Sequence, residues 1–288
     1  MHGHAFNPTQ DLRNLQNFLA ELRHDVGQAA ALHYGDLLWR MRNPANRFDP
    51  STDLRVWTQP DGMIDGFVFH LVCEDNPEFM LRPSHYESEI ATEMVAWARL
   101  RSKQAGATIM ETSCVAGDIE KEKFLRRHGF THFDDVYVFM GRSLAAPIPA
   151  AQPPDHYAIV SHDECRIPSV TGTEMTAPEY ANICAMPGYR DDLGLRVCYR
   201  EREIVAGCIC WFDDIAGSAL FEPVGTVASH RGKGLAFAAM TQTLTNLRRT
   251  GARHVYVKTH KENVPAIRLY EKLGFAILAE DNGWRLVV

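Results

Sequence analysis

The stretch Arg231-Gly232-Lys233-Gly234-Leu235-Ala236 is the part of this chain that points most directly to a fold and a chemistry. It follows an apolar run that predicts a strand over 218–227, and it opens a pattern that predicts a helix reaching about residue 250. Glycines let backbone amides approach an anion closely, and the start of a helix is the positive end of its dipole. Arg231 and Lys233 add positive charge. The stretch therefore predicts a cradle for a pyrophosphate group.

Composition limits the class of protein. The 288 residues are 45% hydrophobic and 23% charged, which suits two domains of ordinary size. A net charge of −6 argues against a general nucleic-acid-binding protein. No apolar run approaches the roughly 18 residues that a membrane helix needs, so we expect no membrane partner. The start of the sequence lacks a signal-peptide pattern, and we expect a cytoplasmic protein.

Cysteine usage predicts reduced thiols. The seven cysteines are scattered and odd in number, and Cys208 and Cys210 alternate along an apolar run, which places both on one side of a strand. We expect buried, unmodified side chains here and no metal site.

A segment rich in proline and alanine divides the chain in two. Residues 145–154 read AAPIPAAQPP, a composition typical of an extended linker. We therefore predict one domain over 1–144, a linker over 145–154 and a second domain over 155–288.

The two halves repeat the same order of landmarks. Pro83 and Ala228 each precede a predicted helix and lie 145 residues apart, and Gly129 and Gly274 repeat that offset. Two landmarks with one offset indicate a duplicated unit. Each half begins with apolar residues at helical spacing. It continues with short runs that predict strands, such as 66–72 and 204–212. The fold class we predict is α/β (α+β), with helices covering a mixed sheet in each half.

Two motifs carry a resemblance to a known family. The segment Arg231-x-x-Gly234-x-Ala236, after its strand, resembles the acyl-CoA-binding signature of the GNAT superfamily of N-acyltransferases. Downstream, Asn263-x-x-Ala266-x-x-x-Tyr270-x-x-x-Gly274-Phe275 is similar to a second block of that family. The resemblance is strong over 155–288 and rests on the internal repeat over 1–145. It implies two tandem GNAT-like domains, each with a mixed, mostly antiparallel sheet.

The resemblance also implies a cofactor site. Acetyl-CoA would enter between two diverging strands, with its pantetheine along Val224, Gly225 and Thr226 and its pyrophosphate on the amides of residues 231–236. The residues expected to bind it are Val224, Gly225, Thr226, Arg231, Gly232, Lys233, Gly234, Leu235, Ala236 and Asn263. Asn263 is equally suited to capping the helix that it precedes.

Only the second half keeps these residues. The 145-residue offset places Tyr86 at the position of Arg231, Glu87 at Gly232 and Glu89 at Gly234. Carboxylates in an anion cradle repel a pyrophosphate, and side chains there block the approach of the backbone. Leu125 replaces Tyr270. We expect that the first half does not bind CoA in this way.

Two residues are candidates for catalysis. Glu222 lies on the strand before the cradle, where apolar neighbours would raise its pKa and suit it to accept the proton of an ammonium group. Substrate binding and a structural role are the alternatives. The resemblance implies that Tyr270 is the general acid for the departing thiolate, against core packing as the alternative. Pro223 removes a backbone donor and predicts a bulge beside Val224, Gly225 and Thr226.

The function that these features favour is transfer of an acetyl group from acetyl-CoA to a small-molecule or peptide amine in a ternary complex. No cysteine lies in the motif blocks, so a covalent acyl-enzyme is not expected. The alternative is a non-catalytic protein that binds acyl-CoA and regulates a partner. We expect either a monomer whose halves form a pseudo-dimer or a homodimer.

Overall fold

The computed structural model describes residues 3–71, 75–161, 177–201 and 203–288, and these residues form two compact units. Unit 1 comprises residues 1–32, 45–138 and 279–288, and unit 2 comprises residues 33–44 and 139–278. Three segments depart from the predicted boundaries, and one of them is residues 139–144, which belong to unit 2. Residues 33–44, from the first half of the sequence, belong to unit 2, and the last ten residues belong to unit 1.

Unit 1 is built on a sheet with strand order β1-β2-β3-β4 and on strand β5, which pairs with the end of the chain. Its elements are β1 (His4–Ala5), α1 (Pro8–Val26), α3 (Pro50–Asp53), β2 (Leu54–Thr58), β3 (Ile64–Leu71), β4 (Asn76–Leu81), α4 (Glu89–Gln104), β5 (Ile109–Val115) and α5 (Ile119–Arg127). A core of aromatic and aliphatic side chains, among them Phe79, Phe124 and Trp284, fills the space between these elements.

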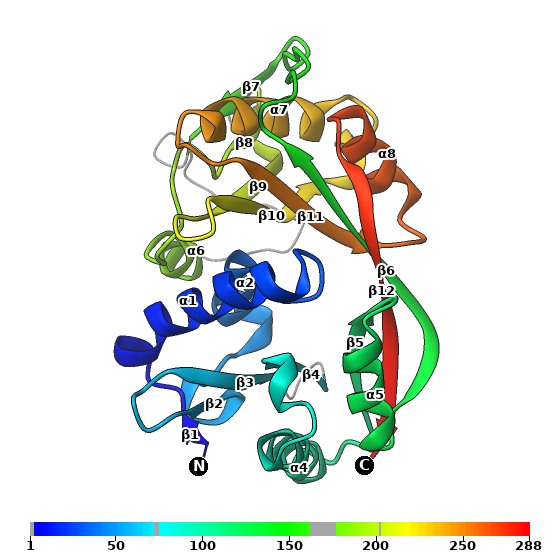
Figure 1. Ribbon diagram of the computed structural model, residues 1–288. Helices are drawn as coiled ribbons and strands as arrows, with labels where there is room; N and C mark the ends of the chain where they lie inside the picture. Colours follow the sequence, from blue (N-terminus) through cyan, green and yellow to red (C-terminus); the bar gives the residue numbers. More distant parts are fainter. Residues whose placement is uncertain (1–2, 72–74, 162–176, 202) are drawn as a thin grey trace. The chain divides into compact units, whose positions relative to one another are not determined.

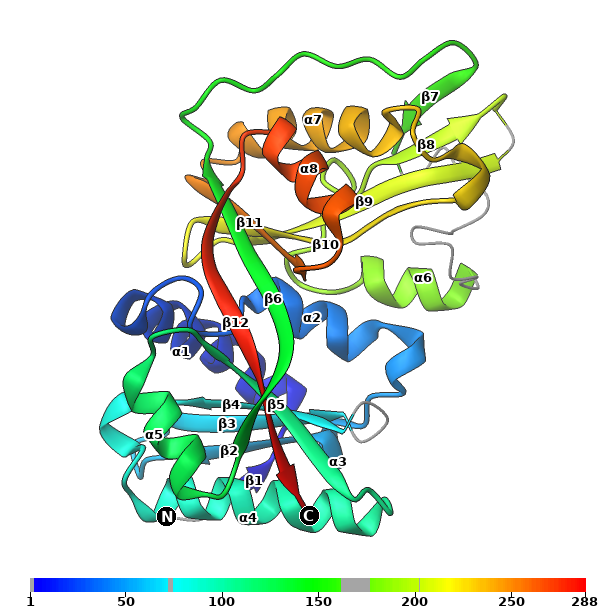
Figure 2. The same ribbon diagram turned by 90° about the vertical axis from the view of Figure 1, so that its right-hand side faces the viewer.

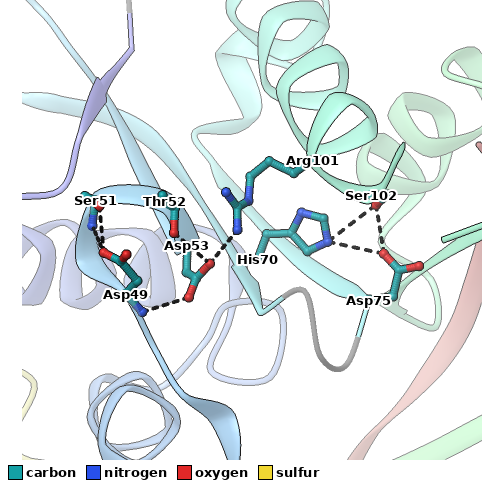
Figure 3. Close-up of polar contacts among 8 residues, drawn as sticks. All are labelled: Asp49, Ser51, Thr52, Asp53, His70, Asp75, Arg101 and Ser102. Atoms are coloured by element: carbon teal, nitrogen blue, oxygen red, sulfur yellow. Dashed lines mark hydrogen bonds and ion pairs between the residues drawn. The ribbon is translucent and has the colours of Figure 1, made fainter. Parts of the chain in front are cut away.

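A buried polar cluster joins His70 on β3 and Asp75, directly before β4, to helix α4 (Figure 3). Ser102 donates a hydrogen bond to Asp75 across 2.8 Å, and the Nε2 of the fully buried His70 lies 3.4 Å from the same carboxylate. The residue before Ser102 on α4, Arg101, forms an ion pair with Asp53 at the end of α3. Burial lowers the pKa of His70 to about 4, so this imidazole is neutral in the folded protein at neutral pH.

Unit 2 is a mixed sheet with helices on both faces. Its elements are α2 (Tyr34–Arg42), β7 (Tyr157–Val160), α6 (Ala177–Cys184), β8 (Arg196–Tyr199), β9 (Glu203–Asp213), β10 (Ser218–Thr226), α7 (Leu235–Arg248), β11 (His254–His260) and α8 (Val264–Lys272). The strand order is β11-β10-β9-β8-β7, in which β10 and β11 are parallel and the other pairs are antiparallel. The predicted fold class, a mixed and mostly antiparallel sheet covered by helices, is confirmed.

The two faces of this sheet carry different helices. Figures 1 and 2 show α7 and α8 on one side of β9 and β10 and α6 on the other. Cys208 faces α7, because its sulfur lies 3.4 Å from the hydroxyl of Thr243. Trp211, three residues further along β9, points to the opposite face and packs against Gly35 of α2. Helix α2 thus covers the face that α7 does not.

Two long strands connect the units along the chain. Strand β6 (Thr131–Ser143) begins in unit 1 and ends in unit 2, and β12 (Ala276–Val287) runs the other way. After β6, residues 147–154 have no regular secondary structure, in keeping with the predicted linker composition.

The element boundaries repeat with the offset read from the sequence. Strand β5 spans residues 109–115 and β11 spans 254–260, while α5 spans 119–127 and α8 spans 264–272. Both pairs differ by 145 residues at each end. The glycines that end the two short helices, Gly129 and Gly274, both have a positive φ, of 88° and 83°. The duplication inferred from the sequence is therefore present in the structure.

The described cysteines are free thiols, and Cys208 and Cys210 are buried on β9 as expected. Burial raises the pKa of Cys208 to about 12. Cys73 and Cys165 lie outside the described residues. Within the described ranges, no helix is long and apolar enough to cross a bilayer and no group of three or more metal-ligating side chains occurs.

Candidate acyl-CoA site

A cavity of about 910 Å³ lies between the end of β10, the start of α7 and helix α8. It unites the two sequence motifs, although they are separated by 27 residues or more along the chain. Its lining residues are Val224, Gly225, Thr226, His230, Arg231, Gly232, Gly234, Leu235, Ala236, Phe237, Asn263, Pro265, Ala266, Arg268, Leu269, Tyr270 and Lys272. Nine of the ten residues predicted to bind the cofactor line this cavity, and Lys233 does not.

The cradle has the backbone conformation that its glycines suggested. Gly232 and Gly234 both have a φ of +76°, a left-handed conformation that other residues adopt only with strain. Gly234 is the N-cap of α7 and has no side chain to accept a hydrogen bond from the first turn. The first residues of α7 line the cavity and their amides have no side-chain cap, and such amides bind phosphate oxygens well.

The two cations of the cradle are placed differently. Arg231 is exposed, and its Nε donates a hydrogen bond to the carbonyl oxygen of Thr226 at 3.1 Å, which holds it beside the end of β10. Lys233 instead donates to the hydroxyl of Tyr157 at 3.1 Å and lies over that ring. That hydroxyl is 2.9 Å from His230. Lys233 thus ties the cradle to β7.

The predicted irregularity at Pro223 is a β-bulge. Phe221 pairs with Cys210 and Val224 pairs with Cys208, so Glu222 and Pro223 together oppose a single residue of β9. The indole of Trp211 donates a hydrogen bond to the carbonyl oxygen of Glu222 at 2.6 Å. The bulge lies directly before Val224, Gly225 and Thr226, which form one wall of the cavity.

Glu222 is a half-buried carboxyl group with a perturbed pKa. Burial raises its pKa to about 8, the charge of Asp36 adds to the rise, and the charges of Arg40 and Lys258 oppose it. A carboxyl group with this pKa exchanges its proton near neutral pH, as a general base must. Glu222 itself is not among the residues that line the 910 Å³ cavity.

Helix α2 supplies two of these neighbours, and its position in unit 2 is fixed by specific contacts. The Nε2 of His33 lies 3.1 Å from the hydroxyl of Ser218 on β10. A Cβ atom on Gly35 would lie 2.4 Å from the Cβ of Trp211, so only glycine allows this approach. At the end of the helix, Arg42 donates to the sulfur of Met186 at 3.0 Å. Because Asp36 and Arg40 lie one turn apart on α2, this docking brings both charges near Glu222.

Tyr270 lines the cavity from helix α8 and is only 5% exposed. Burial is the main cause of its raised pKa, and the nearby charge of Glu222 adds to it. The phenol is therefore protonated throughout the neutral range. Its ring also contacts Phe275, so the packing role considered from the sequence holds beside any chemical one.

Asn263 caps helix α8 and borders the cavity at once. Its side-chain oxygen accepts a hydrogen bond from the amide of Ala266 at 3.4 Å, and its amide group donates to the hydroxyl of Thr259 at 3.2 Å. It also lines the cavity. The two alternatives left open for this residue are therefore compatible.

Several residues of the site were not found from the sequence. Arg268 and Lys272, one turn apart on α8, add two exposed cations to the cavity lining beside Arg231. Their spacing of four residues places them on one helix face, but a charged helix face is ordinary in a soluble domain. Asp36, Arg40 and Lys258 had no sequence signal, because only tertiary packing brings them to Glu222.

The corresponding loop of unit 1 has a different structure. Tyr86 is buried in the core and stacks on Phe124 with ring centroids 5.4 Å apart. Glu87 forms an ion pair with Arg127 at 2.6 Å. Ser88, the N-cap of α4, has a φ of −86°, whereas Gly234, the N-cap of α7, is left-handed. Leu125, at the position of Tyr270, is fully buried in the hydrophobic core.

Comparison with known families agrees with this site. The family profile described as "Acetyltransferase (GNAT) family" matches residues 160–275, which include the cradle, the bulge and the Asn263–Phe275 block. Residues 160–275 are thus similar in sequence to the GNAT family. A comparison with proteins of curated function finds no match.

Solved structures show that the GNAT arrangement extends over the chain. A tandem GNAT protein from the clavulanic acid biosynthesis pathway aligns with a TM-score of 0.69 at 17% identity, over 99% of this chain and 98% of its own. A GCN5-related N-acetyltransferase from Sphaerobacter thermophilus gives a TM-score of 0.63 at 16% identity, over 99% and 95%. A GNAT-family acetyltransferase from Colwellia psychrerythraea gives 0.60 at 12%, over 99% and 100%. The chain therefore has a tandem GNAT fold.

Proposed function

We propose that unit 2 is an N-acetyltransferase that uses acetyl-CoA and an amine acceptor. The observation that carries the proposal is the single cavity in which the cradle of α7, the wall of β10 and Tyr270 of α8 meet. Its volume of about 910 Å³ suits a ligand of cofactor size. Uncapped amides and the side chains of Arg231, Arg268 and Lys272 provide donors and positive charge for phosphate groups.

Glu222 acts as the general base. Its raised pKa of about 8 makes it basic enough to take a proton from an ammonium group, and Lys258 and Arg40 stabilise the carboxylate once it forms. The hydrogen bond from Trp211 holds the backbone of this residue within the bulge. The acceptor amine, once neutral, is the nucleophile.

Tyr270 acts as the general acid. Tyr270 lines the cavity, and its raised pKa keeps the phenol proton in place until a thiolate leaves. The described thiols nearest to this chemistry, Cys208 and Cys210, are buried and have raised pKa values, which makes them poor nucleophiles. We therefore propose direct transfer in a ternary complex.

A thiol-release assay with acetyl-CoA and a panel of amines tests the proposal. We expect turnover with at least one class of amine, and a loss of kcat of about a hundredfold or more in Glu222→Gln. Glu203→Gln, an exposed change on β9, is the matched control. Acetyl-CoA binding without turnover by any amine would support instead the alternative of a non-catalytic, acyl-CoA-binding regulator.

A further inference from the structure

Arg196 on β8 is a buried guanidinium without its expected partners. The residue is 1% exposed, and its Nε and Nη2 atoms have no hydrogen-bond acceptor in the part of the chain that the structure describes. Buried polar groups are nearly always hydrogen-bonded, and a buried charge without a partner destabilises the fold. A buried arginine whose donors lack acceptors is therefore a candidate for binding a ligand.

The two atoms without acceptors form one recognition edge. In a guanidinium, the Nε–H and one N–H of Nη2 point in the same direction, which is the fork that binds both oxygens of a carboxylate. The guanidinium makes a cation–π contact with Tyr180, because its Cζ lies 4.0 Å from the centroid of that ring. The contact with Tyr180 thus positions the guanidinium, while its Nε and Nη2 donors have no acceptor among the described residues.

Among the described residues, the surroundings of Arg196 provide no carboxylate to this edge. The hydroxyls of Tyr180 and Tyr189 bond to each other at 2.6 Å, and the thiol of Cys184 lies beside them. Burial raises the pKa values of both tyrosines and of the cysteine, so all three groups are neutral at pH 7. These uncharged side chains do not neutralise the guanidinium of Arg196, which favours an anion as the ligand of its donor edge.

A row of glycines connects Arg196 to the acyl-CoA site. Arg196 pairs with Gly207 of β9, and Gly207 pairs with Gly225 of β10, so the three residues lie side by side on one face of the sheet. A Cβ atom on Gly207 would lie 3.4 Å from the Cγ of Arg196, so the arginine stem borders this row. Gly225 lines the cavity. Two strand spacings, about 10 Å, separate Gly225 from Arg196.

We propose that Arg196 binds the carboxylate of the acceptor, so that the acceptor is an amino carboxylate. Its amine lies at Glu222, three residues before Gly225 on β10, and its carboxylate reaches the fork across the glycine row. The proposal rests on the proposed transferase function for the amine end. The carboxylate site itself can be tested without turnover.

The first experiment measures binding to the full chain without acetyl-CoA. The probes are the series glycine, β-alanine, γ-aminobutyrate and 6-aminohexanoate, each matched with its carboxamide. Calorimetry of the wild type is expected to show a preference of about tenfold to a hundredfold for one acid over its amide, in line with a charge-assisted bidentate contact. Arg196→Met is expected to abolish that preference, and Arg196→Lys is expected to weaken it because lysine lacks the fork. Arg200→Gln, an exposed change at the end of β8, is expected to leave it intact.

Stability without ligand separates a binding role from a structural one. If Arg196 binds a ligand, then Arg196→Met removes a buried charge without partners, and the melting temperature of the free protein stays equal or rises. A structural role predicts a lower melting temperature instead.

The binding and transfer results together separate a failure of the carboxylate site from a failure of the transferase function. Equal affinity for acids and amides in the wild type, or an unchanged preference in Arg196→Met, overturns the carboxylate site. Acetyl transfer to amines regardless of a carboxylate would leave the transferase function intact and contradict the role of Arg196. Acid-selective binding that depends on Arg196, with no transfer to any amine, would support the site and contradict the transferase function.

Discussion

The indole nitrogen of Trp211 donates a hydrogen bond across 2.6 Å to the carbonyl oxygen of Glu222. Through Trp211, which also contacts Gly35 of α2, a segment from the first half of the sequence is coupled to the bulge of the second-half strand. The same helix brings Asp36 and Arg40 close enough to change the pKa of Glu222. The electrostatics of the candidate base therefore depend on both halves of the sequence.

The pH dependence of transfer tests this coupling. As a base, Glu222 works when deprotonated, so we expect kcat/KM to rise with pH and to level off above the pKa of about 8. Asp36→Asn removes a negative charge that raises this pKa, so the inflection moves to lower pH. Arg40→Gln removes a positive charge that lowers it, so the inflection moves to higher pH. A pH–rate profile that stays in place in both variants would exclude Glu222 as the titrating group.

Replacing Tyr270 with phenylalanine tests the general acid. The ring still fills its place against Phe275, while the proton donor is lost. We expect kcat to fall by about tenfold to a hundredfold or more, with little change in the Kd for acetyl-CoA. Steady-state kinetics and calorimetry measure the two quantities, and Tyr137→Phe on an exposed ring is the control. If kcat were unchanged, Tyr270 would have only its packing role.

The buried His70 of unit 1 makes stability dependent on pH. Its pKa is about 4 in the folded protein, against an ordinary value of 6.5 that applies to the unfolded chain, so between these values the unfolded chain binds the extra proton. Stability from this group is complete above pH 6.5 and is lost as the pH falls toward 4. We expect the free energy of unfolding to drop by on the order of 1–3 kcal/mol across this window.

Urea unfolding at pH 7.5 and pH 5 measures that change. The drop should be smaller in His70→Gln than in the wild type, and His132→Gln, an exposed histidine, should behave like the wild type. Equal drops in all three proteins would mean that His70 is solvated or already charged in the folded state.

Much of this architecture could be predicted because its signals are local. Gly232 and Gly234 suit a left-handed backbone, and Pro223 favours an irregular strand. The 145-residue offset between the halves predicted which later strands and helices would match earlier ones. The exchange of residues 33–44 and 279–288 between the units had no such signal. Whether a helix packs on its own half or on the other depends on tertiary contacts such as that of Gly35 with Trp211.

Calorimetric titration of the full chain with acetyl-CoA measures whether the second-half cradle alone binds the cofactor. We predict one bound acetyl-CoA per chain. Gly234→Glu, which copies the residue at the corresponding position of the first half, should weaken binding by about tenfold or more, because a carboxylate repels the phosphates. Gly234→Ala and Gly251→Ala share the strain of a positive φ without the charge, and both should bind more tightly than Gly234→Glu. Two molecules bound per chain would show a second site outside the cradle, and full affinity in Gly234→Glu would show that the phosphates do not bind at Gly234.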